Sequence, residues 1–276
     1  MADTLAADMI VPDVWADMVQ AELAGNMVLG DLALQDNILE GKPGDTVHFP
    51  KFATLTDADV LTEAVAMVPE KLTTTDETAT ISEAGKAVEI SDTALLTGFG
   101  DPLGEIRRQL GIVVARRIDT SLRAEAEVAG AYTSSVAAAI SADAVADMLG
   151  EFGDNSDPTD FAGLIIHSKQ KTDLFKDDDF TRQDSYGPGN VLARGQIGDI
   201  FGIPVIVSDR VTVTAGAPDT YGAILVKRGA LGLLYKRRPV VESDRDILRR
   251  TTVLTTNVHY AVKRLNDQGV GVLTTQ

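Results

Sequence analysis

Residues 44–94 read GDTVHFPKFATLTDADVLTEAVAMVPEKLTTTDETATISEAGKAVEISDTA. The segment has the pattern of a long β-hairpin, with residues 46–52 as the opening strand, 78–90 as the return limb and 69–71 as the tip or a bend. Eight threonines, which favour extended backbone, lie between residues 54 and 80, and large apolar residues are thinly spread. Because an isolated two-stranded ribbon is marginally stable in water, we expect this one to lie on another surface, most simply a second copy of the chain.

The composition describes a soluble globular protein of 276 residues and 29.3 kDa, with 44% hydrophobic residues but only 5% aromatic ones. The absence of cysteine excludes disulfides, thiolate metal sites and cysteine nucleophiles, and it is typical of a cytoplasmic folding site. The start of the chain lacks the basic region of a signal peptide, and no apolar run has the length of a membrane helix. We therefore expect no membrane partner.

The net charge of −16 is concentrated near the start of the chain. Residues 1–40 contain eight acidic residues and no Lys or Arg. Such a surface repels phosphate groups, so tight, sequence-independent binding to nucleic acid is disfavoured. A general solubilising role explains the excess of acids equally well.

Two helices are predicted in the first half of the chain. Residues 12–23 form an amphipathic segment around Trp15 whose apolar face needs a partner. Residues 101–130 carry the strongest helix signal, with a capping Asp101 followed by Pro102, and would form a strut about 40 Å long. Arginines occupy its other faces. Asp119 with Arg123, and Arg123 with Glu127, are spaced as helix surface pairs.

The second half of the chain has an α/β pattern. Helices are predicted at residues 141–152 and 168–175. Strands are predicted over the following ranges: 164–167, 202–208, 223–226, 231–235, 239–244 and 251–264.

No motif for catalysis, cofactor binding or metal binding stands out. The three histidines, His48, His167 and His259, fall in different predicted strands without metal-ligand spacing. The glycines of residues 98–104 follow no strand and are explained by a helix start, and no Gly-x-Ser-x-Gly elbow occurs. The basic residues between 227 and 250 are interleaved with acids, which favours salt bridges over nucleic-acid binding. We therefore expect neither an enzyme nor a cofactor.

The order of parts, from acidic arm through ribbon and long helix to a compact α/β region and closing strands, resembles the HK97-type major capsid protein of tailed bacteriophages. Four stretches carry the resemblance: 44–52 before the extended loop, 85–96 after it, and 163–168 and 201–209 in the α/β region. The resemblance covers nearly everything after residue 12.

The resemblance implies an α+β fold with an N-terminal arm, an extended β-hairpin loop, a long spine helix, peripheral β-strands and an α/β axial domain. The corresponding ranges are 1–43 for the arm, 44–95 for the loop with its flanking strands, 96–135 for the spine helix, 136–235 for the axial domain and 236–276 for the closing strands of the peripheral domain. Candidate contacts between subunits lie in the arm, the loop, the spine helix and the basic cluster: Trp15, Phe52, Leu61, Val65, Met67, Pro69, Leu72, Arg107, Arg116, Arg237 and Arg238.

The implied function is structural. Hexamers and pentamers of the chain would form the icosahedral head of a virion, assembled in the host cytoplasm around double-stranded DNA that is enclosed without sequence-specific binding. The chain begins directly with its arm, so any scaffolding protein is expected to be a separate partner, together with a portal and, in some heads, a decoration protein.

Two alternatives remain at this point. An encapsulin-like bacterial compartment shell shares the fold but loads a cargo enzyme, and sequence alone separates it poorly from a phage head. An oligomeric α/β enzyme of acidic charge would instead form small oligomers and carry a pocket with perturbed titratable groups.

Overall fold

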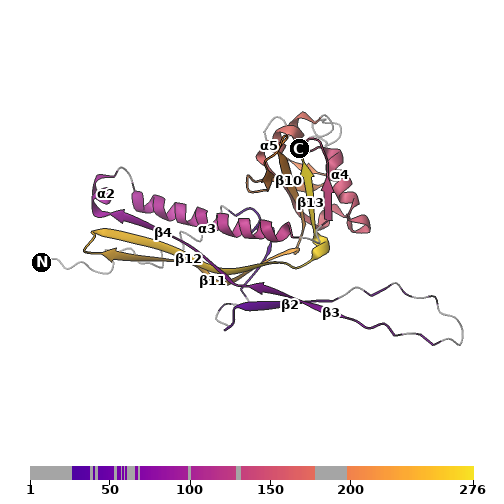
Figure 1. The fold of residues 1–276 in the computed structure, drawn as a ribbon, viewed down its shortest axis with the longest axis horizontal. Helices are drawn as coiled ribbons and strands as arrows, with labels where there is room; N and C mark the ends of the chain where they lie inside the picture. The colour runs from indigo at the N-terminus through magenta and orange to yellow at the C-terminus, as the bar shows by residue number, and fades with distance from the viewer. Residues whose placement is uncertain are drawn as a thin grey trace.

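The computed structural model shows an elongated molecule with three parts: a long platform, a lobe at one end of it and a protruding two-stranded ribbon (Figure 1). The structure describes the following residues: 27–37, 40, 43–52, 55–56, 58, 60, 66–67, 69–98, 101–128, 132–177 and 198–276, with the backbone alone for 50–52. The predicted helix at residues 12–23 lies outside this part of the chain.

The platform is a four-stranded sheet covered on one face by a single helix. Its strands, in spatial order, are β1 (Leu34–Asp36), β11 (Leu231–Asp246), β12 (Thr251–Arg264) and β4 (Ser82–Ser91). The helix α3 (Pro102–Ala126) lies along the sheet, and its predicted start is confirmed because Asp101 accepts a hydrogen bond from the Gly104 amide at 3.0 Å. Its buried stripe joins the main apolar core through side chains that include Val114, Ile118 and Leu122.

The lobe is built on a mixed sheet with helices packed against it. The strands in spatial order are β5 (Tyr132–Ser135), β13 (Val270–Thr275), β10 (Thr220–Lys227), β6 (Phe161–Ile166), β8 (Ile203–Val207) and β7 (Asp199–Ile200), and β9 (Val213–Thr214) pairs with β10. The helices α4 (Ala142–Gly150) and α5 (Ser168–Lys176) bury Met148 and Leu174 in the second apolar core. Short 3-10 turns complete the lobe: η2 (Gly153–Asn155), η3 (Pro158–Asp160) and η4 (Asp267–Gly269).

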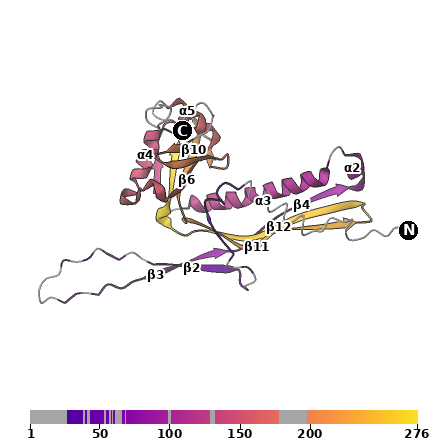
Figure 2. The ribbon, with the colours of Figure 1, turned by 180° about the vertical axis from the view of Figure 1, so that it is seen from behind.

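The ribbon consists of β2 (Thr46–Phe52) and β3 (Thr74–Thr80), which pair antiparallel and form a separate sheet. Only Ile81 separates β3 from β4, so the chain passes there from the ribbon into the platform. After β4 the short helix α2 (Asp92–Thr97) leads towards α3. Figures 1 and 2 show the ribbon pointing away from both the platform and the lobe.

The predicted ribbon is confirmed, but its tip was placed wrongly. Phe52 pairs with Thr74, and the Thr56 amide donates a hydrogen bond to the Glu70 carboxylate at 3.2 Å. Glu70 therefore lies opposite Thr56 on the return limb. The proline at residue 69 suggested a turn, whereas extended backbone also accommodates proline in an edge strand.

Three other sequence predictions need correction. His167, expected in a strand, accepts a hydrogen bond from the Lys169 amide and caps α5. The strands expected at 231–235 and 239–244 are one strand, β11, which bends at register shifts and crosses the expected boundary at 235/236. The last strand, β13, belongs to the lobe sheet and not to the closing strands of the platform.

The expected pair between Asp119 and Arg123 on the surface of α3 is also wrong. Asp119 is fully buried and accepts hydrogen bonds from the backbone amides of Val28, Leu29 and Gly30. The predicted pair between Arg123 and Glu127 is confirmed, since the Arg123 guanidinium group lies 3.9 Å from the Glu127 carboxylate.

Candidate assembly surfaces

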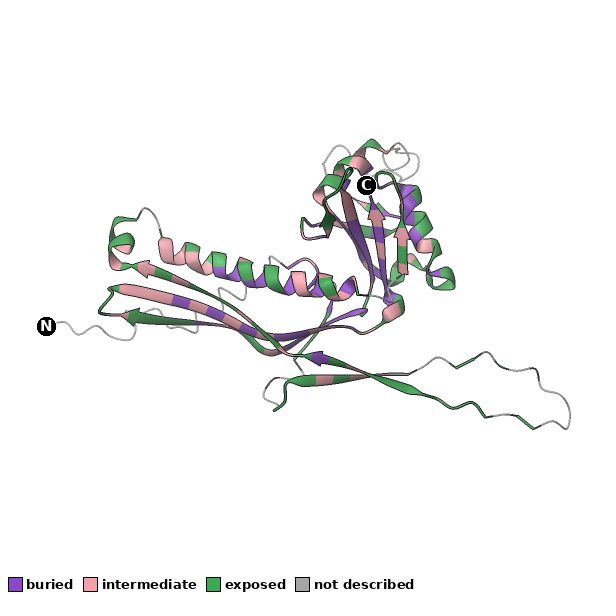
Figure 3. Cartoon of the chain, viewed as in Figure 1, coloured by how far each residue is buried: buried purple, intermediate pink, exposed green. Residues whose placement is uncertain are grey.

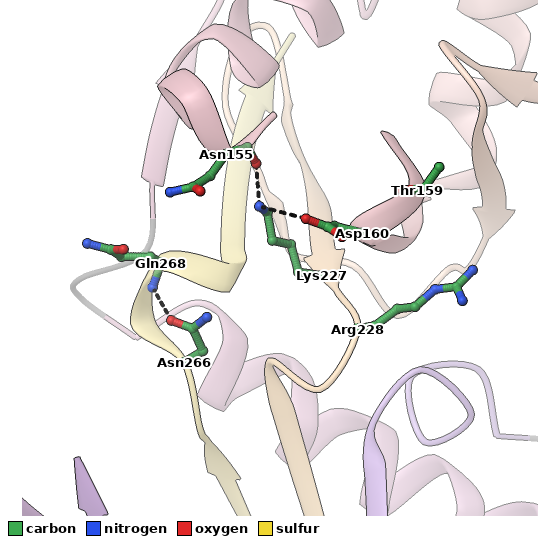
Figure 4. A pocket seen from close by; sticks show the side chains of 7 residues that line it. All are labelled: Asn155, Thr159, Asp160, Lys227, Arg228, Asn266 and Gln268. Carbon is green, nitrogen blue, oxygen red and sulfur yellow. Dashed lines mark hydrogen bonds and ion pairs between the residues drawn. The ribbon is translucent and has the colours of Figure 1, made fainter. Parts of the chain in front are cut away.

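One polar cleft on the described part of the chain has a structural explanation. A polar cleft of about 510 Å³ lies at the base of the lobe, lined by Asn155, Thr159, Asp160, Lys227, Arg228, Asn266 and Gln268 (Figure 4). Its central cation, the Lys227 ammonium group, donates to the Asn155 carbonyl and lies 4.0 Å from the Asp160 carboxylate. The charge is thus neutralised within the lobe, and the arrangement fastens η2 and η3 to β10.

Each histidine faces one acidic side chain. The pairs are His48 with Asp76 at 2.6 Å, His259 with Glu83 at 3.6 Å and His167 with Asp209 at 3.8 Å. In the residues that the structure describes, no group of three or more metal-ligating side chains gathers. A separate property concerns membranes: among the described helices, none combines the length and the apolar character needed to cross a bilayer.

The ribbon exposes apolar side chains that no described residue of the same chain covers. Val60 is 97% exposed and Met67 is 72% exposed, and Leu55 and Leu72 are exposed by about half. Figure 3 shows the ribbon mostly as exposed residues while the platform and the lobe enclose buried ones. A row of large aliphatic groups on a projecting hairpin is costly in water, so the ribbon is suited to contact another molecule.

The root of the ribbon is fixed to the platform by a small apolar cluster and an ion-pair node. Ala79 of β3 packs with Leu234 and Ala261 of the platform. The Lys263 ammonium group lies 3.1 Å from carboxylates of Glu77 on β3 and Glu125 on α3. These contacts hold the direction in which the ribbon leaves the body.

A second exposed surface lies on the outer face of α3. Arg116 and Arg117 are exposed, and Val113 beside them is partly exposed. Neither arginine has an ion pair with a described residue. This face combines positive charge with an aliphatic group. It is chemically complementary to the ribbon loop, residues 53–73, in which Asp57, Glu63 and two further acids outnumber the single base Lys71.

A third exposed surface is the tip of the β11–β12 hairpin, which sequence reasoning missed. Leu248 is 94% exposed and Ile247 is 79% exposed, and Leu96 of the neighbouring helix α2 is 86% exposed. The tip is ordered because the Asp246 carboxylate accepts hydrogen bonds from the amides of Leu248 and Arg249. The pair Ile-Leu between charged residues in a hairpin turn is the signal that the sequence offered.

The predicted contact residues are spread over these surfaces. Trp15, Leu61 and Val65 lie outside the described residues, as does the side chain of Phe52. Met67, Pro69 and Leu72 are exposed on the ribbon, and Arg116 is exposed on α3, where Arg107 is half-buried.

The remaining two candidates have partners within the chain. Arg237 lies 3.5 Å from Glu242, and Arg238 stacks over the Tyr235 ring at 5.9 Å. Elsewhere in the basic cluster, Arg245 lies 2.7 Å from Asp92. The cluster therefore forms internal salt bridges, as its alternation with acids predicted.

Comparison with known proteins gives one consistent result. A family described as phage capsid protein matches residues 74–272. The major capsid protein of Staphylococcus phage phiMR11 is 32% identical over 275 residues, which cover 99% of this chain and 96% of that protein.

Solved structures of phage capsids share the fold. The capsid of cyanophage P-SCSP1u matches with a TM-score of 0.73 and 14% identity, covering 91% of this chain and 88% of that one. The acid-stable capsid of Helicobacter pylori bacteriophage KHP30 matches with a TM-score of 0.72 and 11% identity, covering 99% and 94%. The predicted α+β fold of the HK97 type is confirmed.

Proposed function

The chain belongs to the phage capsid protein family, and from this membership we propose how its surfaces build a shell. Its role as a structural shell protein of a phage head follows from the family and from the relative, which favour it over the encapsulin-like compartment. The proposal concerns the contacts between copies. The ribbon of one copy lies across the outer face of α3 in an adjacent copy, and the platform tip meets a further copy.

The single observation that carries the proposal is the ribbon itself. Val60 and Met67 are among the most exposed large apolar side chains of the described residues, and both lie on a hairpin that projects beyond its own body. Burying them against a second copy would stabilise the assembly by roughly 1.5–3 kcal/mol per side chain. Many copies of such a contact add up in a closed shell, so that each can be weak individually.

Charge supports the choice of α3 as the acceptor. The ribbon loop carries an excess of carboxylates, and Arg116 and Arg117 offer positive charge on an exposed helix face. Arg107 lies on the same helix. The predicted contact residues in the loop are Phe52, Leu61, Val65, Pro69 and Leu72. Trp15 would supply a contact from the arm, and Arg237 and Arg238 from β11.

The parts of the chain have distinct roles in this proposal. Residues 1–43 form the arm, 44–95 the extended loop, 96–135 the spine helix with its flanks, 136–235 most of the axial domain and 236–276 most of the closing strands, with β11 shared and β13 in the axial sheet. Axial domains surround the centres of hexamers and pentamers, and the platforms form the rims. No enzymatic activity or cofactor is required.

The remaining partners follow from the shell function. The head encloses double-stranded DNA without reading its sequence, since an acidic wall does not grip phosphate groups. It assembles in the host cytoplasm, guided by a separate scaffolding protein around a portal, and a decoration protein can bind its outside.

The test is to purify the chain, alone and with proteins encoded beside it, and to examine it by negative-stain electron microscopy. Closed particles tens of nanometres wide are expected for the natural chain. A Val60→Asp and Met67→Asp double variant should fold but form at most separate capsomers, whereas Thr73→Asp, at an exposed polar position of the same ribbon, should still give particles. Normal particles from the double variant would refute the proposed ribbon contact.

A further inference from the structure

Residues 27–36, here called the strap, cross α3 and end as β1 beside β11. Met27, Leu29 and Ala33 are buried in the platform core, and Leu34 to Asp36 pair in parallel with residues 232–234. The strap is the first described part of the chain. Its position therefore fixes the point from which residues 1–26 extend.

One buried carboxylate holds the strap. The Oδ2 atom of Asp119 accepts a hydrogen bond from the Val28 amide at 3.0 Å. Its Oδ1 atom accepts from the amides of Leu29 and Gly30, both at 3.2 Å. Three consecutive backbone donors thus converge on one side chain, which is the arrangement of an anion-binding nest.

Asp119 lies where packing alone would favour an apolar residue. It is 0% exposed, and its neighbours on the buried stripe of α3 are Ala115, Ile118 and Leu122. A buried carboxylate carries a large desolvation penalty, which an apolar side chain at this position would not. The three amide donors offset that penalty only while the strap holds them against the carboxylate.

The Asp119 carboxylate instead favours one placement of the strap along α3. The strap contains several aliphatic side chains, including Leu29 and Leu32, and apolar contacts alone discriminate weakly between alternative placements. The three amides face the carboxylate because residues 29–33 form a turn, in which the amides of Leu32 and Ala33 both donate to the Leu29 carbonyl. A strap shifted along α3 would move this turn away from the buried charge. The side chain of Gln35 closes the same turn by donating to the Gly30 carbonyl at 2.9 Å.

We propose that Asp119 is a positioning residue that selects one register of the strap on α3 and so fixes where the N-terminal arm leaves the body. The inference rests on the proposed shell function, because the arm serves assembly only if every copy presents it from the same place. It does not depend on the ribbon contact.

The test compares Asp119→Leu and Asp119→Asn with the natural chain by amide hydrogen exchange before assembly. In Asp119→Leu the amides of residues 28–30 should exchange at least about tenfold faster than in the natural chain, while the amides of β12 in the centre of the platform keep their protection. Asp119→Asn should show a smaller increase, since its Oδ1 can still accept from Leu29 and Gly30. Asp147→Leu, at an exposed position of helix α4 in the lobe, should leave the strap unchanged.

Electron microscopy then shows the consequence for assembly. Particles from Asp119→Leu should be irregular or open, and those from Asp147→Leu regular. Strap amides that stay protected in Asp119→Leu, or regular shells despite a loosened strap, would overturn the inference. If Asp119→Leu fails to fold, the exchange rates of Asp119→Asn decide. A natural chain that never forms particles would contradict the shell function. The comparison of amide exchange rates would still test whether Asp119 sets the register of the strap.

Discussion

The ammonium nitrogen of Lys263 on β12 lies 3.1 Å from a carboxylate oxygen of Glu77 on β3, and this ion pair joins the ribbon to the platform. The same nitrogen lies 3.1 Å from Glu125 at the end of α3. Burial opposes the charge of Lys263, but the hydrogen bonds to Glu125 and Glu77 prevail and raise its pKa. A single cation therefore ties three elements together where the ribbon begins.

Lys263→Met should destabilise the protein by about 1–2 kcal/mol, because it leaves two carboxylates close together without their shared cation. Urea unfolding of the protein before assembly measures the change. Lys176→Met is the matched control, since Lys176 is exposed and its pair with Asp173 spans one helical turn; we expect less than about 0.5 kcal/mol there. Equal losses in the two variants would contradict a special role for Lys263.

The contribution of Asp119 should depend on pH. Burial is the main cause that raises its pKa above 3.8, against the hydrogen bonds from the strap and the positive charge of Arg210, while Tyr235 and Asp31 also face this region. The folded state therefore binds the proton more readily than the unfolded state. The contribution of Asp119 to the free energy of unfolding is fully present at pH values below its unfolded pKa. It is lost as the pH rises through its folded pKa.

Asp119→Asn, which does not titrate, provides the comparison. The free energy of unfolding of the natural chain minus that of Asp119→Asn should fall as pH rises above 3.8, the ordinary pKa of the side chain. Urea midpoints across this range measure the difference. A difference that grows with pH would mean that the strap amides outweigh burial and lower the pKa instead.

Sequence reasoning succeeded where local chemistry and tertiary structure agree. The start of α3 follows from Asp101 and Pro102, and the ribbon strands follow from threonine content and alternation. It failed where distant residues decide. The spacing of Asp119 and Arg123 suits a surface pair, and only the packing of the strap, about ninety positions away in the chain, buries the carboxylate.

The same reason explains the errors in strand assignment. Residues 236–238 are charged, so they appeared to separate two strands, yet β12 pairs with β11 on both sides of them through register shifts. The sequence predicted the exposed ribbon as a contact surface, but it did not predict the exposed tip of the β11–β12 hairpin. Ile247 and Leu248 lie between the two predicted strands, and the pairing of Asp246 with Thr251 shows that they form the hairpin turn.

Gly271 should not tolerate a side chain. It lies in β13, and a Cβ atom there would come within 2.1 Å of the Met148 Cε and 3.0 Å of the Phe152 ring. Gly271→Ala should therefore destabilise the lobe by about 1–3 kcal/mol through overpacking. Gly150→Ala, at the end of α4 with open space around the added atom, should be neutral or slightly stabilising. Thermal unfolding of both variants checks the contrast, and similar midpoints would show that the lobe core repacks freely.

Leu248→Ser should separate folding from assembly at the platform tip. The side chain is 94% exposed, so its loss should change the free energy of unfolding by less than about 0.5 kcal/mol. In a shell, however, it would remove an apolar contact repeated in every copy, so the protein concentration needed for particles to form should rise several-fold. Light scattering during assembly measures that concentration. Leu248→Met keeps an apolar side chain and should assemble like the natural chain, and an unchanged threshold for Leu248→Ser would show that the tip stays in solvent.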